Sequence, residues 1–162
     1  MQGGVIRNYG NLKVTADFIG NSATAEVQDG SINAKAYGYG GAIYNHGNAS
    51  TISGDYIDNS ATTSGGAIYN LSEIGSINGS FITNHALNGS GGAIYNGQSG
   101  NIQAVAGAFI SNTAAQSGGA IYNKGSNTTS AIINMNAGKN KSIKFNDKIT
   151  GSENIDKNLL NI

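Results

Sequence analysis

The chain lacks cysteine, proline and tryptophan altogether, and charged residues make up only 11% of its 162 positions. Without cysteine it can form neither a disulfide nor a thiolate metal site. Its formal net charge is zero, so nothing in its electrostatics favours nucleic acid or an anionic membrane as a partner. It has no apolar run near the roughly 20 residues that cross a bilayer, and no signal peptide at its start. We expect no nucleic-acid partner and no membrane insertion by this segment, and we expect any export signal to lie outside it.

What the chain has instead is glycine, with 25 residues, together with abundant asparagine, serine and threonine. Glycine costs roughly 1 kcal/mol relative to alanine inside a helix, and the small polar residues are weak helix formers. The apolar residues are mostly isoleucine, alanine, tyrosine, valine and phenylalanine, a set that includes several good strand formers. The composition therefore indicates an all-β protein.

The dominant pattern is an internal repeat, and repeats decide the fold of a chain. The hexapeptide GGAIYN occurs four times, with starts 25, 26 and 27 residues apart, at 40–45, 65–70, 91–96 and 118–123. A weaker copy, GGVIRN at 3–8, starts 37 residues before the next, which is one period plus an insertion. A second motif, aromatic-Ile-x-Asn-x-Ala, lies between the copies within 17–23, 55–61, 80–86 and 108–114. We place the insertion at 24–39, where the two motifs are farthest apart.

Variation between the copies indicates which residues face inward. In the second motif the x positions vary freely and are expected to face solvent, whereas Ile19, Asn21, Ala23 and their equivalents face the interior. Arg7 replaces the tyrosine in the weaker copy, and arginine is rarely buried without a partner, so the tyrosine position is expected to point outward. The isoleucine before it and the asparagine after it then point inward. The adjacent Phe18 and Ile19 break strict alternation, which predicts a corner there, and the Gly-Gly pair predicts another.

A repeat of about 25 residues cannot bury its own apolar face, but stacked repeats can. We therefore predict a right-handed parallel β-helix, a β-solenoid of about five to seven coils of roughly 25–27 residues, with three short strands in each coil. Equivalent side chains would form ladders about 4.8 Å apart, and such ladders can satisfy buried asparagine amides. The apolar ladders are Ile43, Ile68, Ile94 and Ile121, and Phe18, Tyr56, Phe81 and Phe109. The asparagine ladders are Asn45, Asn70, Asn96 and Asn123, and Asn21, Asn59, Asn84 and Asn112.

The repeat divides the chain into two regions. Residues 1–123 form the GGAIYN region with its insertion at 24–39, and residues 124–162 form a region of divergent sequence. In the divergent region, alternation of apolar and polar residues persists, so we expect one or two further coils there. The chain begins inside a repeat and ends on apolar residues, whereas the ends of a solenoid need polar caps. We therefore expect the same solenoid to continue at both ends, with the C-terminal coils truncated.

These motifs carry a family resemblance. GGAIYN preceded by F-I-x-N-x-A resembles the GGAI and FxxN repeats of polymorphic outer-membrane proteins and related type V autotransporter passengers, over about residues 3–123. The segment SIKFNDKITGS at 142–152 is similar to one that often follows such repeats in autotransporters. The resemblance implies a secreted passenger at the outer membrane or cell surface, with an adhesive or immune-facing role. The partner would be a host-cell or matrix protein, or a glycan.

Few residue patterns in the sequence indicate a catalytic site or a metal site. Asp17 and Asp55 occupy equivalent positions with Asp58 nearby, and a carbohydrate-active β-helix needs clustered acids, but we interpret these three as solvated surface groups. His46 and His85 have no acid or second histidine at metal-ligand spacing. The glycine-rich strings lack the Lys-Ser/Thr of a phosphate loop and the aspartates of calcium-binding repeats. We expect no metal, no cofactor and no enzymatic activity.

Two features are candidates for ligand binding. The first is an outward row of tyrosines, one in each coil, with Arg7 at its end: Tyr44, Tyr69, Tyr95 and Tyr122. Such a row can stack on sugars or pack on a partner, but its rings can also stack on one another and shield the sheet, which is the interpretation we favour. The second is the insertion with Tyr37 and Tyr39, since loops on a rigid scaffold often carry binding residues.

The leading hypothesis is a structural and adhesive passenger segment. One rival is a fragment of a carbohydrate-active β-helix enzyme, which requires Asp17, Asp55 and Asp58 to meet in a groove. Another is a passive spacer stalk. An ice-binding solenoid is disfavoured because no regular Thr-x-Thr ladder appears.

Overall fold

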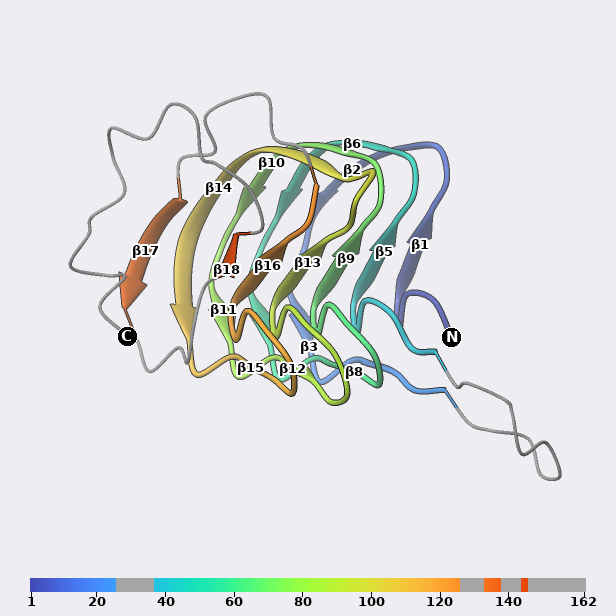
Figure 1. Ribbon diagram of the computed structural model, residues 1–162. Coiled ribbons are helices and arrows are strands. Elements are labelled where there is room, and N and C mark those ends of the chain that lie inside the picture. Colours follow the sequence, from blue (N-terminus) through green and yellow to red (C-terminus); the bar gives the residue numbers. More distant parts are fainter. Residues whose placement is uncertain (26–36, 126–132, 138–143, 146–162) are drawn as a thin grey trace, which may run out of the picture.

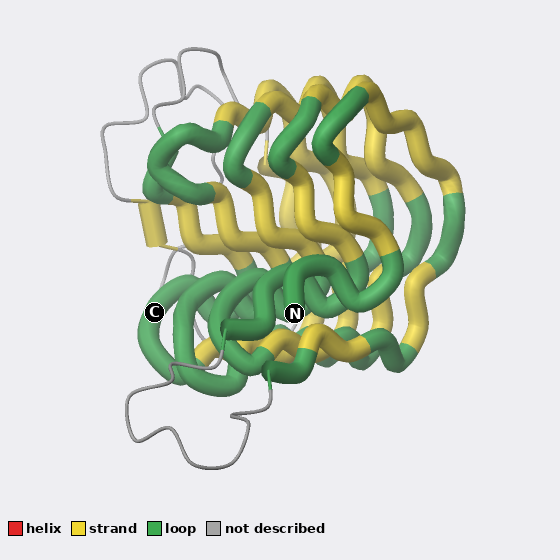
Figure 2. The backbone as a smooth tube through the Cα atoms, turned by 90° about the vertical axis from the view of Figure 1, so that its right-hand side faces the viewer, coloured by secondary structure: helices red, strands yellow, loops and turns green. Residues whose placement is uncertain are grey.

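The structure is a computed structural model that describes residues 1–25, 37–125, 133–137 and 144–145. Within these ranges every regular element is a β-strand, and the paired strands all run parallel. Successive turns of the chain lie one upon another (Figure 1 and Figure 2), so the molecule is a parallel β-helix. The predicted fold class is confirmed, although a coil carries four short strands where three were expected.

The IYN residues of the GGAIYN motif build the first sheet, which faces the viewer in Figure 1. Its strands are β1 (Ile6–Asn8), β5 (Ile43–Asn45), β9 (Ile68–Asn70), β13 (Ile94–Asn96), β16 (Ile121–Asn123) and β18 (Lys144–Phe145). Equivalent residues pair directly, so Ile43 lies beside Ile68 and Asn45 beside Asn70. A copy of the motif therefore stands over the next copy with no shift in register.

The segment that follows builds a second, larger sheet on the opposite side of the coil. Its long strands are β2 (Asn11–Thr15), β6 (Asn48–Ser53), β10 (Glu73–Asn78), β14 (Asn101–Ile110) and β17 (Ile133–Ala137). The second motif adds β3 (Phe18–Ile19), β7 (Tyr56–Ile57) and β11 (Phe81–Ile82), which join this sheet through β14. A third sheet consists of β4 (Ser22–Ala23), β8 (Ser60–Ala61), β12 (His85–Ala86) and β15 (Thr113–Ala114).

The core between these sheets is made of columns of like side chains. The isoleucines of the first sheet form one column, and an aromatic column faces them from β3, β7, β11 and β14. Its ring centroids lie 5.1 Å apart for Phe18 and Tyr56, 4.7 Å for Tyr56 and Phe81, and 4.8 Å for Phe81 and Phe109. Full burial of one such side chain contributes about 1.5–3 kcal/mol, and offset stacking adds to this. A single coil cannot provide these contacts, so the fold depends on stacking.

Asparagine side chains form two hydrogen-bonded ladders inside the same core. In the first sheet Asn45 Nδ2 donates to Asn70 Oδ1 over 2.8 Å, and Asn70 Nδ2 donates to Asn96 Oδ1 over 2.7 Å. In the second ladder Asn59 Nδ2 donates to Asn84 Oδ1 over 2.9 Å, and that oxygen also accepts the Asn59 backbone N–H over 3.0 Å. Both ladders donate toward the C-terminal end. A buried amide without partners costs about 1–3 kcal/mol, so this pairing makes the interior asparagines tolerable and ties them to one register.

One prediction about the interior is wrong. Ile19 is 64% exposed, while Phe18 before it is only 5% exposed, so the aromatic-Ile pair keeps normal strand alternation. The corner comes one residue later, at a position with positive φ: Gly20 (67°), Asp58 (54°), Thr83 (52°) and Ser111 (55°). A left-handed residue there turns the following asparagine inward. The isoleucine after the aromatic therefore belongs to the surface.

The Gly-Gly pair makes the other predicted corner. Gly65 has φ +67°, which glycine adopts without strain. Gly66 is needed for a different reason, because a Cβ at this position would collide with the Gly92 carbonyl oxygen and lie 2.6 Å from the His85 nitrogen. The first glycine turns the chain, and the second allows neighbouring coils to approach.

The insertion and the divergent region lie largely outside the described residues. Residues 26–36 of the insertion and most of 126–162 are not described. Of the divergent region, β17 pairs with β14 and β18 pairs with β16, so both strands continue existing sheets.

Candidate functional site

The tyrosines of the GGAIYN motif form a stacked row on the outside of the first sheet. The ring centroids lie 5.6 Å apart for Tyr44 and Tyr69, 4.7 Å for Tyr69 and Tyr95, and 5.3 Å for Tyr95 and Tyr122. The rings of the first two pairs are nearly parallel, with interplanar angles of 4° and 0°. The in-register strands beneath place the rings at this spacing.

The row widens at its N-terminal end because the insertion adds two rings. Tyr39 lies 4.5 Å from Tyr69 in a tilted arrangement, and Tyr37 stacks on Tyr39 at 5.7 Å. The structure therefore brings together both groups of tyrosines that the sequence offered as separate candidates. Tyr37 remains 47% exposed.

A further pair of rings, which the sequence analysis did not include, completes this surface. Tyr9 lies 6.3 Å from Tyr44 and 5.3 Å from His46, and the Arg7 guanidinium stands 4.8 Å over the Tyr9 ring. Arg7 also donates a hydrogen bond from Nε to the Tyr9 hydroxyl over 3.0 Å. Tyr9 and His46 each follow the motif's asparagine, in N-Y-G and N-H-G. Aligning the residues after the hexapeptide would have identified this position.

We call the seven stacked or adjoining rings the tyrosine array. It consists of Tyr9, Tyr37, Tyr39, Tyr44, Tyr69, Tyr95 and Tyr122. Packing leaves the central rings half-buried, and Tyr44 is only 4% exposed. Burial, followed by the neighbouring phenols, raises the pKa of Tyr69 well above its usual 10.0, and burial likewise raises the pKa of Tyr95. These hydroxyls therefore stay neutral at physiological pH.

The acids of the enzyme hypothesis have a different role. Asp17 Oδ1 accepts the backbone N–H of Asp55 over 2.8 Å, and Asp55 Oδ1 accepts that of Ser80 over 3.1 Å. Each carboxylate thus bonds to the coil that follows it. Asp58 instead faces His85, with 3.9 Å between its Oδ1 and the His85 Nε2. All three aspartates therefore contact residues of the following coil.

Among the described residues, no group of three or more His, Asp or Glu side chains is placed to hold a metal ion. The His85 Nδ1 is 2.7 Å from the Thr113 hydroxyl on the neighbouring strand. In the described ranges there is also no helix of the length and apolarity needed to cross a membrane.

The fold and the repeated surface define a class of protein, a β-solenoid built from sequence repeats that presents an extended face. Three segments match the model of the Chlamydia polymorphic membrane protein repeat, at 15–46, 57–71 and 107–124. These matches confirm the resemblance seen in the motifs of the chain. No curated protein and no solved structure gives a significant match.

Proposed function

We propose that the chain is part of the passenger of an autotransporter-like protein at the outer membrane or cell surface, and that it acts in adhesion. The polymorphic membrane protein repeats support a place at the surface. Adhesion is supported chiefly by one observation: seven of the eight tyrosines gather in a single array on one face of the solenoid.

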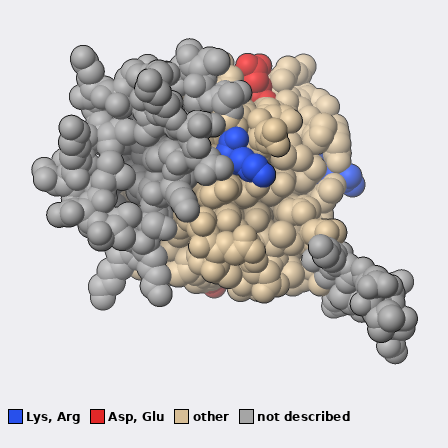
Figure 3. Space-filling model, viewed as in Figure 1, with Lys and Arg blue, Asp and Glu red and all other residues tan. Residues whose placement is uncertain are grey.

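The array has the properties of a contact surface. Tyrosine is enriched among the residues that contribute most to binding, because its ring buries a large area while its hydroxyl can form hydrogen bonds. The exposed rings lie at one end, where Tyr9 is 56% and Tyr37 is 47% exposed. The face that contains β5, β9 and β13 carries few charged groups (Figure 3), so desolvating it on contact costs little. The partner that fits is a host-cell or matrix protein.

Enzymatic activity is not part of the proposal. The carboxylates of Asp17 and Asp55 already accept backbone hydrogen bonds. A passive spacer remains the alternative outcome of the test, because the same rings also stack on one another.

The test is the binding of the fluorescently labelled full chain to cultured epithelial cells, measured by flow cytometry over a concentration series. We expect saturable binding that weakens roughly ten-fold in the double variant Tyr9→Ser, Tyr37→Ser, since two exposed aromatic anchors are lost. The control is Leu87→Ser, which removes a 55% exposed apolar side chain away from the array. Absence of saturable binding would contradict the adhesive role and favour a spacer, whereas equal loss in the control would contradict the role of the tyrosine array in binding.

A further inference from the structure

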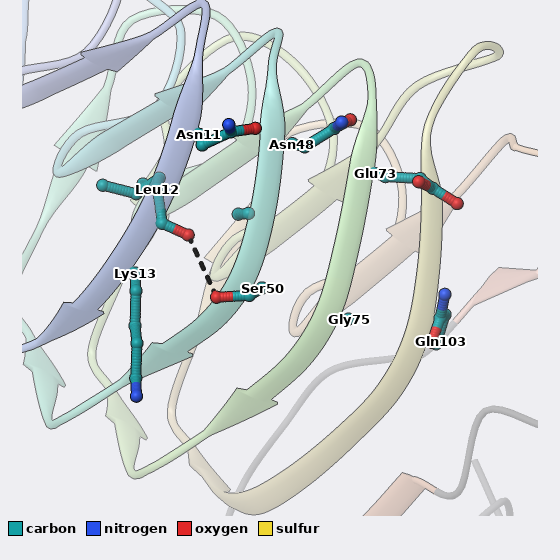
Figure 4. Close-up of a pocket in the computed structure, with 9 residues that line it drawn as sticks. Asn11, Leu12, Lys13, Asn48, Ser50, Glu73, Gly75 and Gln103 are labelled. Carbon is teal, nitrogen blue, oxygen red and sulfur yellow. Dashed lines mark hydrogen bonds between the residues drawn. The ribbon is translucent and has the colours of Figure 1, made fainter.

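A shallow trough crosses the outer face of the second sheet, away from the tyrosine array. It has a volume of about 440 Å³ and is lined by residues of β2, β6, β10 and β14, so it spans four successive coils (Figure 4). Its long direction therefore follows the solenoid axis. Four strands at about 4.8 Å spacing cover roughly 14 Å.

An irregularity in the sheet produces the trough. Between β2 and β6 the register shifts after Leu12, so no β2 residue pairs with Ser50, although the Ser50 hydroxyl donates to the Leu12 carbonyl over 3.4 Å (Figure 4). Ser50 and Gly75 lie at the same level on neighbouring strands, because the residues on either side of them pair. Both are small, and a Cβ at Gly75 would lie only 2.6 Å from the Ser50 carbonyl oxygen. Small side chains therefore form the floor of the trough in the middle of the sheet.

The rim carries polar side chains whose hydrogen-bonding groups are unused. Asn11, Asn48 and Glu73 stand in a row on one side and Lys13 on the other, while Gln103 on β14 lies level with Gly75 at one end of the trough (Figure 4). All five are exposed, and none has a side-chain hydrogen bond or ion pair within the described part of the chain. Each carboxamide can both donate and accept. This contrasts with the interior asparagines, whose amides are all engaged in ladders.

We propose that this trough binds a neutral linear glycan laid along the solenoid axis. A sugar chain presents hydroxyl or acetamido groups at intervals close to the strand spacing, and side chains that both donate and accept suit such groups. The small floor residues leave space for the rings.

Other ligand classes fit this trough less well. An anionic polymer needs an excess of positive charge, whereas Lys13 is balanced by Glu73. A protein partner is usually anchored by aromatic or arginine side chains, and the lining contains neither. Glu73 is the only carboxylate of the lining, and glycoside hydrolysis ordinarily uses two, so the site binds its glycan without cleaving it.

This inference is independent of the tyrosine array, because the two surfaces lie on different sheets. The test is a titration of the ¹⁵N-labelled full chain with cellotetraose and, separately, with chitotetraose, followed by backbone amide NMR shifts. We expect at least one of the two to give saturable shifts that map to Asn48, Ser50, Gly75 and Gln103. Binding should be unaffected by Tyr9→Ser, Tyr37→Ser, so a failure of either proposal leaves the other intact.

Variants separate the trough from the rest of the face. Asn48→Ala with Gln103→Ala should weaken binding roughly 20-fold, since two hydrogen bonds are lost. Ser50→Phe should abolish it by filling the floor. Asn78→Ala is the matched control, because Asn78 is an exposed asparagine of β10 outside the lining. The proposal is overturned if neither tetrasaccharide shifts the trough amides, or if Ser50→Phe binds as the unmodified chain does.

Discussion

Asparagine occurs both in the interior and at the trough, but the two kinds differ in burial and in hydrogen bonding. Asn84 is fully buried, and its amide takes part in hydrogen bonds to neighbours on both adjoining coils. Asn48 lies on the outer face, exposed and without a partner in the described structure. The first kind recurs in each coil of the repeat region, whereas the column of Asn11 and Asn48 is interrupted by Glu73 in the next coil. The comparison separates residues that fix the register of the solenoid from residues that are free to bind.

The largest expected loss of stability comes from a substitution that pushes neighbouring coils apart, because the interior ladders depend on close stacking of the coils. Gly66→Ala should destabilise the chain by about 4 kcal/mol or more, because its Cβ has no space beside the Gly92 carbonyl. Chemical denaturation followed by circular dichroism measures this. Gly10→Ala is the control, since no atom lies within 4 Å of a Cβ there. Equal stability of the two variants would contradict close coil stacking.

Breaking one ladder is expected to have the next largest effect. Asn84→Ala should lower the free energy of unfolding by roughly 3 kcal/mol, because the Asn59 N–H and the Tyr56 carbonyl lose their partner inside the core. Asn48→Ala should change it by less than about 0.5 kcal/mol. If both asparagines had the same effect in the same denaturation experiment, the distinction between interior and surface would fail.

Alkaline pH should weaken the fold through its buried phenols. Burial raises the pKa of Tyr56 well above its usual 10.0. A raised folded-state pKa means that the unfolded chain loses the proton first, so stability is unaffected below pH 10 and falls as the pH rises above it. For Tyr56 alone the limiting slope is about 1.4 kcal/mol per pH unit. Denaturation curves from pH 8 to 11.5 test this, and a flat profile would show that the ring is accessible to solvent.

The smallest effect has the opposite sign. The Tyr56 hydroxyl is buried without a hydrogen-bond partner among the described residues, in a column whose other members are phenylalanines. Tyr56→Phe should therefore stabilise the chain by about 1 kcal/mol and reduce its loss of stability above pH 10. Thermal unfolding at pH 7 provides the measurement. A destabilised Tyr56→Phe variant would indicate that the hydroxyl has a partner.

Most of the fold could be predicted because each copy of the repeat occupies an equivalent environment. Substitutions between copies identified the inward isoleucine and asparagine of GGAIYN. The same comparison failed at Ile19, which occurs as isoleucine in every copy although it faces outward. The informative signal was the next position, where Gly20 and Asp58 are residues that tolerate positive φ.

The candidate sites were harder to predict from the sequence than the fold was. The tyrosine row follows the period and was predicted, but its contact with Tyr39 depends on where the insertion returns to the sheet. The trough was not predicted, because Lys13, Glu73 and Gln103 differ in residue type from the residues at the equivalent positions of neighbouring coils. It arises from a register shift that the sequence shows only as spacing, since Val14 lies six positions after Asn8 and Ile52 lies seven positions after Asn45.

The side-chain amide protons of asparagine test the central comparison most directly, through their hydrogen exchange observed by NMR. If the interior ladders exist, the amides of Asn59 and Asn84 should exchange roughly 100-fold or more slowly than those of Asn11 and Asn48, because opening them requires the coils to separate. Equal, fast exchange at all four residues would contradict the stacked ladders and, with them, the register of the solenoid.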